Sequence, residues 1–461
     1  MLNGSYDIRI IALILIIAIV EIIVYVSNAK KWQEKLVIIL LLGGTTIYSG
    51  IGISMPSVDK SYILIFALFL LFEGFGLHLG HHIFKEKEEQ QLDYISYISN
   101  SKYLISAMAI IYWIITLILL VYPENHLSSL FSIRLDITGV IESRISKRTN
   151  LVVYTLGLLS KIISPFYCIY LSKQRKSKII ILLLLEAYIN TAIDGYIGRT
   201  AIMMLLVEVI LILLLINSSE KNRKKKYKIT LGKHDLTRTG KDKSENQKNT
   251  GRVKQALVVF AVGFVIAIPF LVSYQFTRHG QSYSGTGFMD SFFLLFDSEI
   301  NYPKYYSTCE SLTGNVISPI DYAYWFLTLP IPKELFSLPS ATTITYSFSS
   351  MVRGISFGQQ GFSVLLTSLM GEGILLWGKS FCLIHALFLG TVWGAINSFL
   401  TKHRELFVFQ ILFIARTLNM VRGGTQGSMA TIINGIIPFV VICYVIFNIS
   451  TSKSKRNGAP I

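Results

Sequence analysis

Long apolar segments recur along the chain, separated by short stretches that carry charged or turn residues. A helix of about 20 apolar residues is long enough to cross a hydrocarbon layer of about 30 Å. The pattern therefore predicts an all-α polytopic membrane protein with about eleven transmembrane helices. These lie near 8–27, 36–55, 61–82, 103–122, 151–171, 179–194, 200–217, 256–272, 380–400, 405–421 and 429–449.

The composition supports the same class of protein. Hydrophobic residues make up 52% of the chain and charged residues 15%, whereas soluble domains carry about 25% charged residues. A single water-soluble globule is therefore excluded. Four cysteines lack the paired spacings that disulfide frameworks and metal sites use, so neither is implied; they are Cys168, Cys309, Cys382 and Cys443. We expect no metal and no cofactor.

Basic residues orient the predicted spans, because lysine and arginine resist translocation. With the N-terminus outside, the segments predicted to face the cytoplasm hold 28 of the 43 lysines and arginines. The C-terminus is then cytoplasmic. This bias accounts for the net charge of +16 without a nucleic-acid partner.

The spans and loops predict six regions. They are a bundle of seven spans (1–217), a basic cytoplasmic loop (218–255), an eighth span (256–272), an external loop between the eighth and ninth spans (273–379), the last three spans (380–449) and a cytoplasmic tail (450–461). The exit of the external loop, near 362–378, is apolar, but a further crossing there would reverse the basic bias. We therefore expect it to be half-buried or re-entrant.

The two long loops have opposite compositions. Segment 218–255 contains 13 basic and 4 acidic residues, which is typical of a solvated cytoplasmic loop, and we assign it no chemistry. Segment 273–361 contains 18 aromatic residues among 89, enough to fold as a cap. Aromatic residues there either dock on the membrane interface or stack on sugar rings; the candidates are Phe288–Phe296, Tyr322, Tyr324, Trp325 and Phe326.

Ionisable residues inside spans are costly and are therefore candidates for function. They are Glu21, Glu73, His78, Lys161, Glu186, Asp194, Glu208, Glu372, His385 and Arg416.

Arginines and glycines gather in the turns on the predicted outer face. Asp194 and Arg199 lie in one short turn, and Arg416 precedes a turn with Arg422 and Gly427. Arginine binds phosphate through a planar fork that is always charged. The arginines either anchor the spans and pair with carboxylates such as Asp194, or they bind an anionic ligand at the outer leaflet.

The exit of the external loop carries a second group of candidates. Arg353 precedes Gly354, and Glu372 lies between Gly371 and Gly373. A partly buried carboxylate can act as a general base, or it can hold an arginine in place. The sequence leaves both roles open for Glu372, with His279 and His385 as less favoured substitutes.

Taken together, these features resemble the bacterial polysaccharide repeat-unit polymerases, the Wzy family of O-antigen and capsule polymerases. The resemblance rests on the turn Gly198-Arg199-Thr200, the two long loops, the loop exit with Ser368-Leu369-Met370-Gly371-Glu372-Gly373, and the segment from Arg416 to Gly427. No phosphate-binding loop, dinucleotide fingerprint, metal-binding His-Glu pattern or serine hydrolase elbow is present.

The resemblance implies a metal-independent inverting glycosyltransferase of the GT-C class in the bacterial plasma membrane. It would polymerise undecaprenyl-diphosphate-linked oligosaccharides at the outer face into a surface polysaccharide (O-antigen or capsule, and so lipopolysaccharide biosynthesis). Arg199, Arg416 and Glu372 would be the catalytic residues, with substrate-binding roles for Arg422, Asp194, Arg353, Gly427, Tyr324 and Trp325. A chain-length regulator and a flippase of the same pathway are the implied partners.

Two alternatives stay open. One is a related ligase or a peptidoglycan-type polymerase; a ligase is expected to use a histidine near the end of the loop, and none lies between 280 and 384. The other is a flippase or another transporter. Transporters commonly carry internal repeats, and no repeat is evident in this sequence.

Overall fold

The computed structural model describes residues 6–29, 31–83, 93–122, 150–194, 300–329, 331, 344–356, 359, 362, 364–403 and 406–456. These residues form helices and connecting segments, and no strand occurs among them. The predicted all-α class is therefore confirmed for the described part of the chain.

Three helices open the fold. They are α1 (Ile8–Asn28), α2 (Trp32–Thr45) and α3 (Tyr62–Ile83). The side chain of Asp7 caps α1 by accepting a hydrogen bond from the backbone N–H of Arg9 at 2.9 Å. The segment after α2 is not regular α-helix, because it forms a π-helix (η1, Thr46–Gly50) and then a 3₁₀-helix (η2, Ile51–Ser54).

A second group contains α4 (Asp93–Asn100), α5 (Lys102–Val121), α7 (Leu151–Ser172) and α8 (Lys176–Asp194). Asn150 caps α7, because its side-chain oxygen accepts hydrogen bonds from the backbone N–H groups of Val152 and Val153. On α5 and α7, Tyr112 and Tyr167 stack with ring centroids 4.5 Å apart.

The last three helices are α15 (Ser368–Lys402), α16 (Phe407–Gly423) and α17 (Thr425–Arg456). Inside α15, Gly378 has φ +78° and ψ 171°, which interrupts the helix. A Cβ at Gly373 would lie 3.1 Å from the Cβ of Cys382 and 3.3 Å from that of His385. Nine helical residues would otherwise span about 13 Å, so the first part of α15 folds back on the second. We call residues 368–377 the half-helix.

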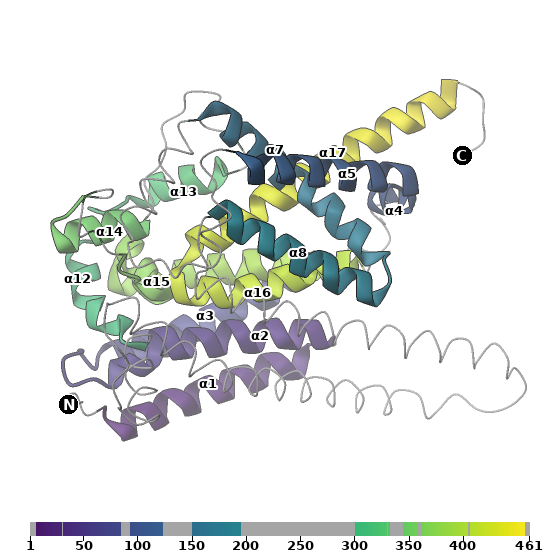
Figure 1. Ribbon diagram of the computed structural model, residues 1–461. Coiled ribbons are helices and arrows are strands. Elements are labelled where there is room, and N and C mark those ends of the chain that lie inside the picture. The colour runs from purple at the N-terminus through teal and green to yellow at the C-terminus, as the bar shows by residue number, and fades with distance from the viewer. Residues whose placement is uncertain are drawn as a thin grey trace, which may run out of the picture.

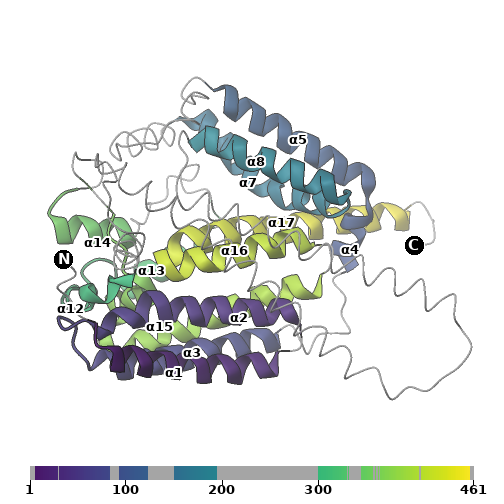
Figure 2. The same ribbon diagram turned by 60° about the horizontal axis from the view of Figure 1, so that its bottom comes forward.

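The membrane-length helices lie in three layers (Figure 2). One layer contains α1, α2, α3 and α15, the next α16 and α17, and the third α5, α7 and α8. Short helices gather at the end where α15 begins (Figure 1): η4 (Tyr302–Tyr305), α12 (Tyr306–Ser311), α13 (Pro319–Leu327) and α14 (Ile344–Arg353). We call this the Gly378 end.

Seven described helical segments are long and apolar enough to cross a membrane. They are Ile8–Asn28, Trp32–Ser54, Tyr62–Ile83, Lys102–Val121, Leu151–Ser172, Ser368–Lys402 and Ser428–Ser450. Many of their large apolar side chains stay exposed, as on α1, where Ile8 is 79% and Ile23 61% exposed. Such continuous apolar surface is expected of a protein embedded in lipid. The number of spans stays a prediction. Helices α8 and α16 lie at two more of the predicted spans, 179–194 and 405–421, and the predicted spans 200–217 and 256–272 lie outside the described residues.

Glycines allow α3 and the long part of α15 to pack at backbone contact. Gly76 and Gly80 on α3 face Gly390 and Gly394 on α15, and both pairs have four-residue spacing. A Cβ at Gly80 would lie 2.0 Å from the carbonyl oxygen of Thr391. Small residues at this spacing let membrane helices approach closely, and the pairing makes α3 and α15 parallel neighbours.

Replacing Gly80 with alanine is therefore expected to destabilise the protein, because the added methyl group would push two backbones apart. Overpacking of this kind costs roughly 1 to 3 kcal/mol. Gly157→Ala is the matched control, since a Cβ at Gly157 on α7 meets no atom within 4 Å. Thermal unfolding in detergent should show a lower melting temperature for Gly80→Ala only; equal melting temperatures would contradict this packing.

Candidate functional site

Glu372 connects the half-helix to the start of α17. The side chains from Ser368 to Leu376 are all buried, and Glu372 is 1% exposed. Its Oε2 accepts a hydrogen bond from the backbone N–H of Thr425 at 2.9 Å, and its Oε1 accepts one from the Thr425 hydroxyl. A carboxylate is favourable at a helix N-terminus, where the first N–H groups lack helical partners. Glu372 thus fixes the turn between α16 and α17.

The turn itself depends on Gly424. This residue has φ +82°, a conformation that L side chains rarely adopt. A Cβ there would lie 2.1 Å from Oε2 of Glu372. Glycine at 424 therefore serves both the backbone conformation and the close approach of the carboxylate. Arg422, one of the predicted binding residues, lies two residues before it, at the end of α16.

Two further side chains surround this carboxylate. Tyr322 on α13 donates a hydrogen bond to Thr425 Oγ1 at 3.2 Å. Burial raises the pKa of Tyr322, and the Glu372 carboxylate raises it further, so its hydroxyl stays a proton donor. Nε2 of His385 lies 3.5 Å from Oε1 of Glu372, and the rings of His385 and Tyr322 have centroids 5.7 Å apart. We call Tyr322, Glu372, His385, Gly424 and Thr425 the Glu372 site.

A second set of polar contacts joins the half-helix to the irregular end of α2. The hydroxyl of Tyr306 donates to the carbonyl oxygen of Ser49, in η1, at 2.7 Å and lies 3.3 Å from Oγ of Ser368. Ser368 has φ +64°, which is rare for a residue other than glycine. Strain of this type is often found at functional sites. Two interrupted helices therefore meet at the Gly378 end.

Thr313 and Gly314, which follow α12, hold the far end of the half-helix. Its carbonyl groups at Ile374 and Leu375 accept hydrogen bonds from the Thr313 hydroxyl at 3.0 Å and the Gly314 backbone N–H at 3.1 Å. These contacts satisfy carbonyl groups that a helix end leaves without partners. The exit of the predicted loop is consequently a packed element of the core.

The other predicted site residues have varied positions. Arg416 and Arg422 are half-buried on α16, and the Arg416 carbonyl oxygen accepts a hydrogen bond from Ser428 Oγ at 3.0 Å. Gly427 lies in α17, three residues after Gly424. Arg353 ends α14 and is exposed.

Tyr324 and Trp325 lie on α13, with Tyr324 37% and Trp325 7% exposed. Asp194 is the last residue of α8. Outside the described residues lie Arg199, Glu208, His279 and the predicted interfacial helix Phe288–Phe296. The structure therefore joins Glu372 to the turn after Arg422. It also brings His385 to 3.5 Å from Glu372 and places the ring of Trp325 5.5 Å from that of Tyr322.

Two other carboxylates inside predicted spans have simpler partners. Glu73 on α3 is fully buried and accepts a hydrogen bond from the Thr45 hydroxyl at 3.2 Å. Glu186 on α8 accepts one from the Tyr112 hydroxyl at 2.5 Å. Each joins two neighbouring helices, which is a sufficient structural role.

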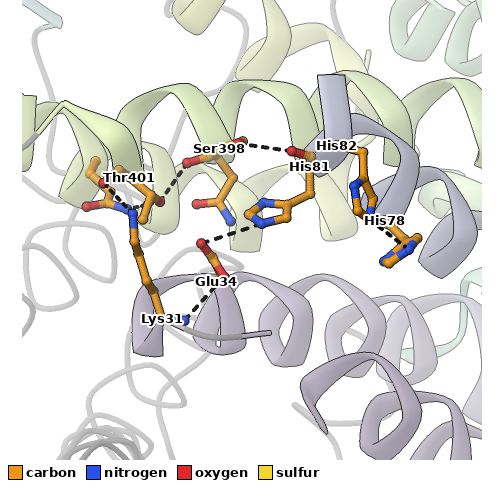
Figure 3. A network of polar contacts seen from close by, with 9 residues as sticks. Lys31, Glu34, His78, His81, His82, Ser398 and Thr401 are labelled. Atoms are coloured by element: carbon orange, nitrogen blue, oxygen red, sulfur yellow. Dashed lines mark hydrogen bonds and ion pairs between the residues drawn. The ribbon is translucent and has the colours of Figure 1, made fainter. Parts of the chain in front are cut away.

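A polar cluster lies at the opposite end of α3 and α15 (Figure 3). The backbone N–H of Lys31 donates to Oε2 of Glu34 at 3.2 Å, and Nζ of Lys31 donates to the Thr401 carbonyl oxygen at 3.3 Å. Nε2 of His81 lies 3.7 Å from Oε1 of Glu34. These contacts join α2, α3 and α15 at this end.

A cavity of about 190 Å³ lies beside this cluster. Its lining includes His78 and His82, whose Nε2 atoms are 3.1 Å apart, together with Lys31, Glu34 and Asn397. Within the described part of the chain, no group of three or more histidine, cysteine, aspartate or glutamate side chains is placed to hold a metal ion. None of the predicted catalytic or binding residues lines the cavity, so we place the candidate site at the Gly378 end.

Sequence reasoning missed Thr425 and gave Tyr322 no role beside Glu372. The turn after Arg416 was predicted, and the pair Gly423-Gly424 in it is a signal for a helix boundary that could have singled out Thr425. No local pattern could have paired Tyr322 with Thr425, because the two are 103 residues apart.

Comparison with known proteins gives no further assignment. No protein-family model, curated protein or solved structure matches this chain significantly.

Proposed function

We propose that this protein polymerises undecaprenyl-diphosphate-linked oligosaccharide repeat units into a bacterial surface polysaccharide, O-antigen or capsule. The proposed reaction is a metal-independent, inverting glycosyl transfer at the outer face of the plasma membrane. The single observation that carries the proposal is the contact between Glu372 and Thr425. This contact joins two of the segments on which the family resemblance rests, the loop exit with Glu372 and the segment from Arg416 to Gly427.

In the proposed reaction, a hydroxyl of the incoming repeat unit attacks the anomeric carbon of the growing chain. The bond from that carbon to the lipid diphosphate breaks and the new glycosidic bond forms. The hydroxyl proton passes to a base or, where Glu372 is only an orienting group, to an oxygen of the departing diphosphate. Fixed positive charge stabilises the departing diphosphate where negative charge develops. We assign this role to Arg199, Arg416 and Arg422.

Glu372 has two candidate roles in this scheme, the base for the acceptor hydroxyl and the orienting group. A base has to reach the proton that it abstracts. Both oxygens of Glu372 accept hydrogen bonds from Thr425, and the side chain is 1% exposed. This geometry supports the orienting role: Glu372 would be a positioning residue that fixes the turn after Arg422.

A transporter, in particular the flippase of the same pathway, is the second candidate. Interrupted helices are common in transporters, and two such elements, η1 with η2 and the half-helix, meet at the Gly378 end. They lie toward one end of the helices, whereas transporter sites lie near the middle of the membrane. We therefore prefer the polymerase.

Deleting the gene in its native host separates these candidates. Loss of a polymerase leaves single repeat units capped on the surface carrier, without a ladder of long chains. Loss of a flippase removes surface material and traps lipid-linked units inside, and loss of a ligase leaves long chains on the lipid carrier. Either of the last two patterns would overturn the proposal.

Arg199 provides a test of the charge mechanism. Arg199→Ala is expected to abolish the ladder in the deletion strain, and Arg199→Lys should fail to restore it, because an ammonium group lacks the bidentate fork. Immunoblots must show normal membrane levels of both variants. A full ladder from Arg199→Ala would remove this residue from the mechanism.

A further inference from the structure

Helix α13 presents an apolar face that is exposed. Ile320 is 80%, Leu327 74% and Tyr324 37% exposed. At 3.6 residues per turn these side chains lie within about 60° of one another around the helix. Ala323, also exposed, extends the same face. A nine-residue helix with such a surface needs an apolar neighbour.

The opposite face of α13 is packed into the protein. Tyr322 is 4% and Trp325 7% exposed, and their rings have centroids 5.5 Å apart. The Ser318 side chain caps the helix by accepting a hydrogen bond from the backbone N–H of Asp321 at 3.1 Å. Because this face and this cap fix the helix, its apolar surface is presented in one orientation.

The exposed surface of α13 continues onto α15. Phe326 packs edge-to-face on Phe388 with ring centroids 5.0 Å apart. Phe388 belongs to a stripe on α15 in which Phe381 is 63%, Ile384 47% and Phe388 36% exposed. Helix α15 is one of the seven segments long enough to cross a membrane. The stripe is therefore surface that lipid chains would cover, and α13 lies directly beside it.

We propose that α13 lies in the membrane interface, with Ile320, Tyr324 and Leu327 inserted at the boundary between headgroups and acyl chains. Tyrosine is typical of this boundary, because its ring is apolar and its hydroxyl is polar. The same helix donates the Tyr322 hydroxyl to Thr425, so the lipid surface lies one helix away from the Glu372 site. This inference depends on membrane insertion but not on glycosyl transfer.

Spin labels on introduced cysteines test this placement. The four native cysteines are buried, so the unsubstituted chain serves as the labelling blank. The test variants are Ile320→Cys and Leu327→Cys. The control on the same helix is Asp321→Cys, because Asp321 lies about 100° around the helix from Ile320. Each is reconstituted in nanodiscs of phosphatidylethanolamine and phosphatidylglycerol. Relaxation by oxygen is then compared with relaxation by a water-soluble nickel complex.

Labels at 320 and 327 are expected to respond mainly to oxygen, at a depth of roughly 5 to 10 Å below the headgroups. The label at 321 should respond mainly to nickel. Equal access of nickel to all three positions would overturn the proposal, because the face would then be in water. Protection of 320 and 327 from both reagents would also overturn it and would indicate a protein neighbour. Neither result would bear on the polymerase activity.

Discussion

Gly424→Ala is expected to abolish the polysaccharide ladder and to lower the stability of the protein. Gly424 has φ +82° and ψ −176°, a region that almost only glycine adopts, and a side chain there costs roughly 1 to 3 kcal/mol. The new Cβ would also lie 2.1 Å from Oε2 of Glu372, so the carboxylate would have to leave Thr425. The turn that follows Arg422 would then lose its fixed position. Complementation of the deletion strain and thermal unfolding in detergent measure the two effects.

Gly423→Ala is the matched control for this prediction. Gly423 is the last residue of α16, and a Cβ there would meet no atom within 4 Å. The control variant should keep the ladder and the melting temperature of the wild type. A wild-type ladder from Gly424→Ala would contradict the arrangement of the turn described above, and the same defect in both variants would show that the effect is not specific to Gly424.

The second large effect is expected at Glu372. In Glu372→Gln one side-chain oxygen remains and can accept from the backbone N–H of Thr425. The amide nitrogen cannot accept the hydrogen bond that the Thr425 hydroxyl donates, so this hydroxyl loses its acceptor. An unpaired buried donor costs about 1 to 3 kcal/mol. We therefore expect Glu372→Gln to lose most of the ladder. Glu310→Gln is the control, because an amide oxygen can still accept the hydrogen bond that Tyr62 donates to Glu310 Oε2 at 2.7 Å.

Variants of Thr425 distinguish the two roles of Glu372. If Glu372 only positions the turn, Thr425→Val should reproduce part of the Glu372→Gln defect, and Thr425→Ser should restore activity because it keeps the hydroxyl. If Glu372 is instead the base, Thr425→Val should keep the pH dependence of the wild-type polymerising activity. In Glu372→Gln, the titration of the base should then be missing from that pH dependence. A fully active Thr425→Val beside an inactive Glu372→Gln would contradict the positioning role.

The helices could be predicted from the sequence because their signal is local. Apolar length alone placed the predicted spans 8–27 and 61–82 within a few residues of α1 and α3. The predicted span 36–55 agrees with the extent of α2, η1 and η2, but its π-helix and 3₁₀-helix were not predicted. Their geometry depends on partners such as Tyr306, 257 residues from Ser49, which no local pattern contains.

The candidate site could be predicted only in part. Glu372 was recognised because a carboxylate between glycines in an apolar stretch is unusual. Its partner Thr425 could not be, because their contact requires the half-helix to fold back at Gly378 and the turn at Gly424 to adopt a positive φ. The role of Arg199 stays a sequence-based prediction, since that residue lies outside the described part of the chain.

The most direct test of the polymerase proposal uses purified protein. Lipid-linked repeat units, extracted from the deletion strain, are added to the full chain reconstituted in phospholipid vesicles, and the products are separated on a gel. The proposal predicts a ladder of lipid-linked chains, formed from this one substrate class and absent with Gly424→Ala. Unchanged single units, or products formed only when a second class of acceptor is supplied, would contradict it.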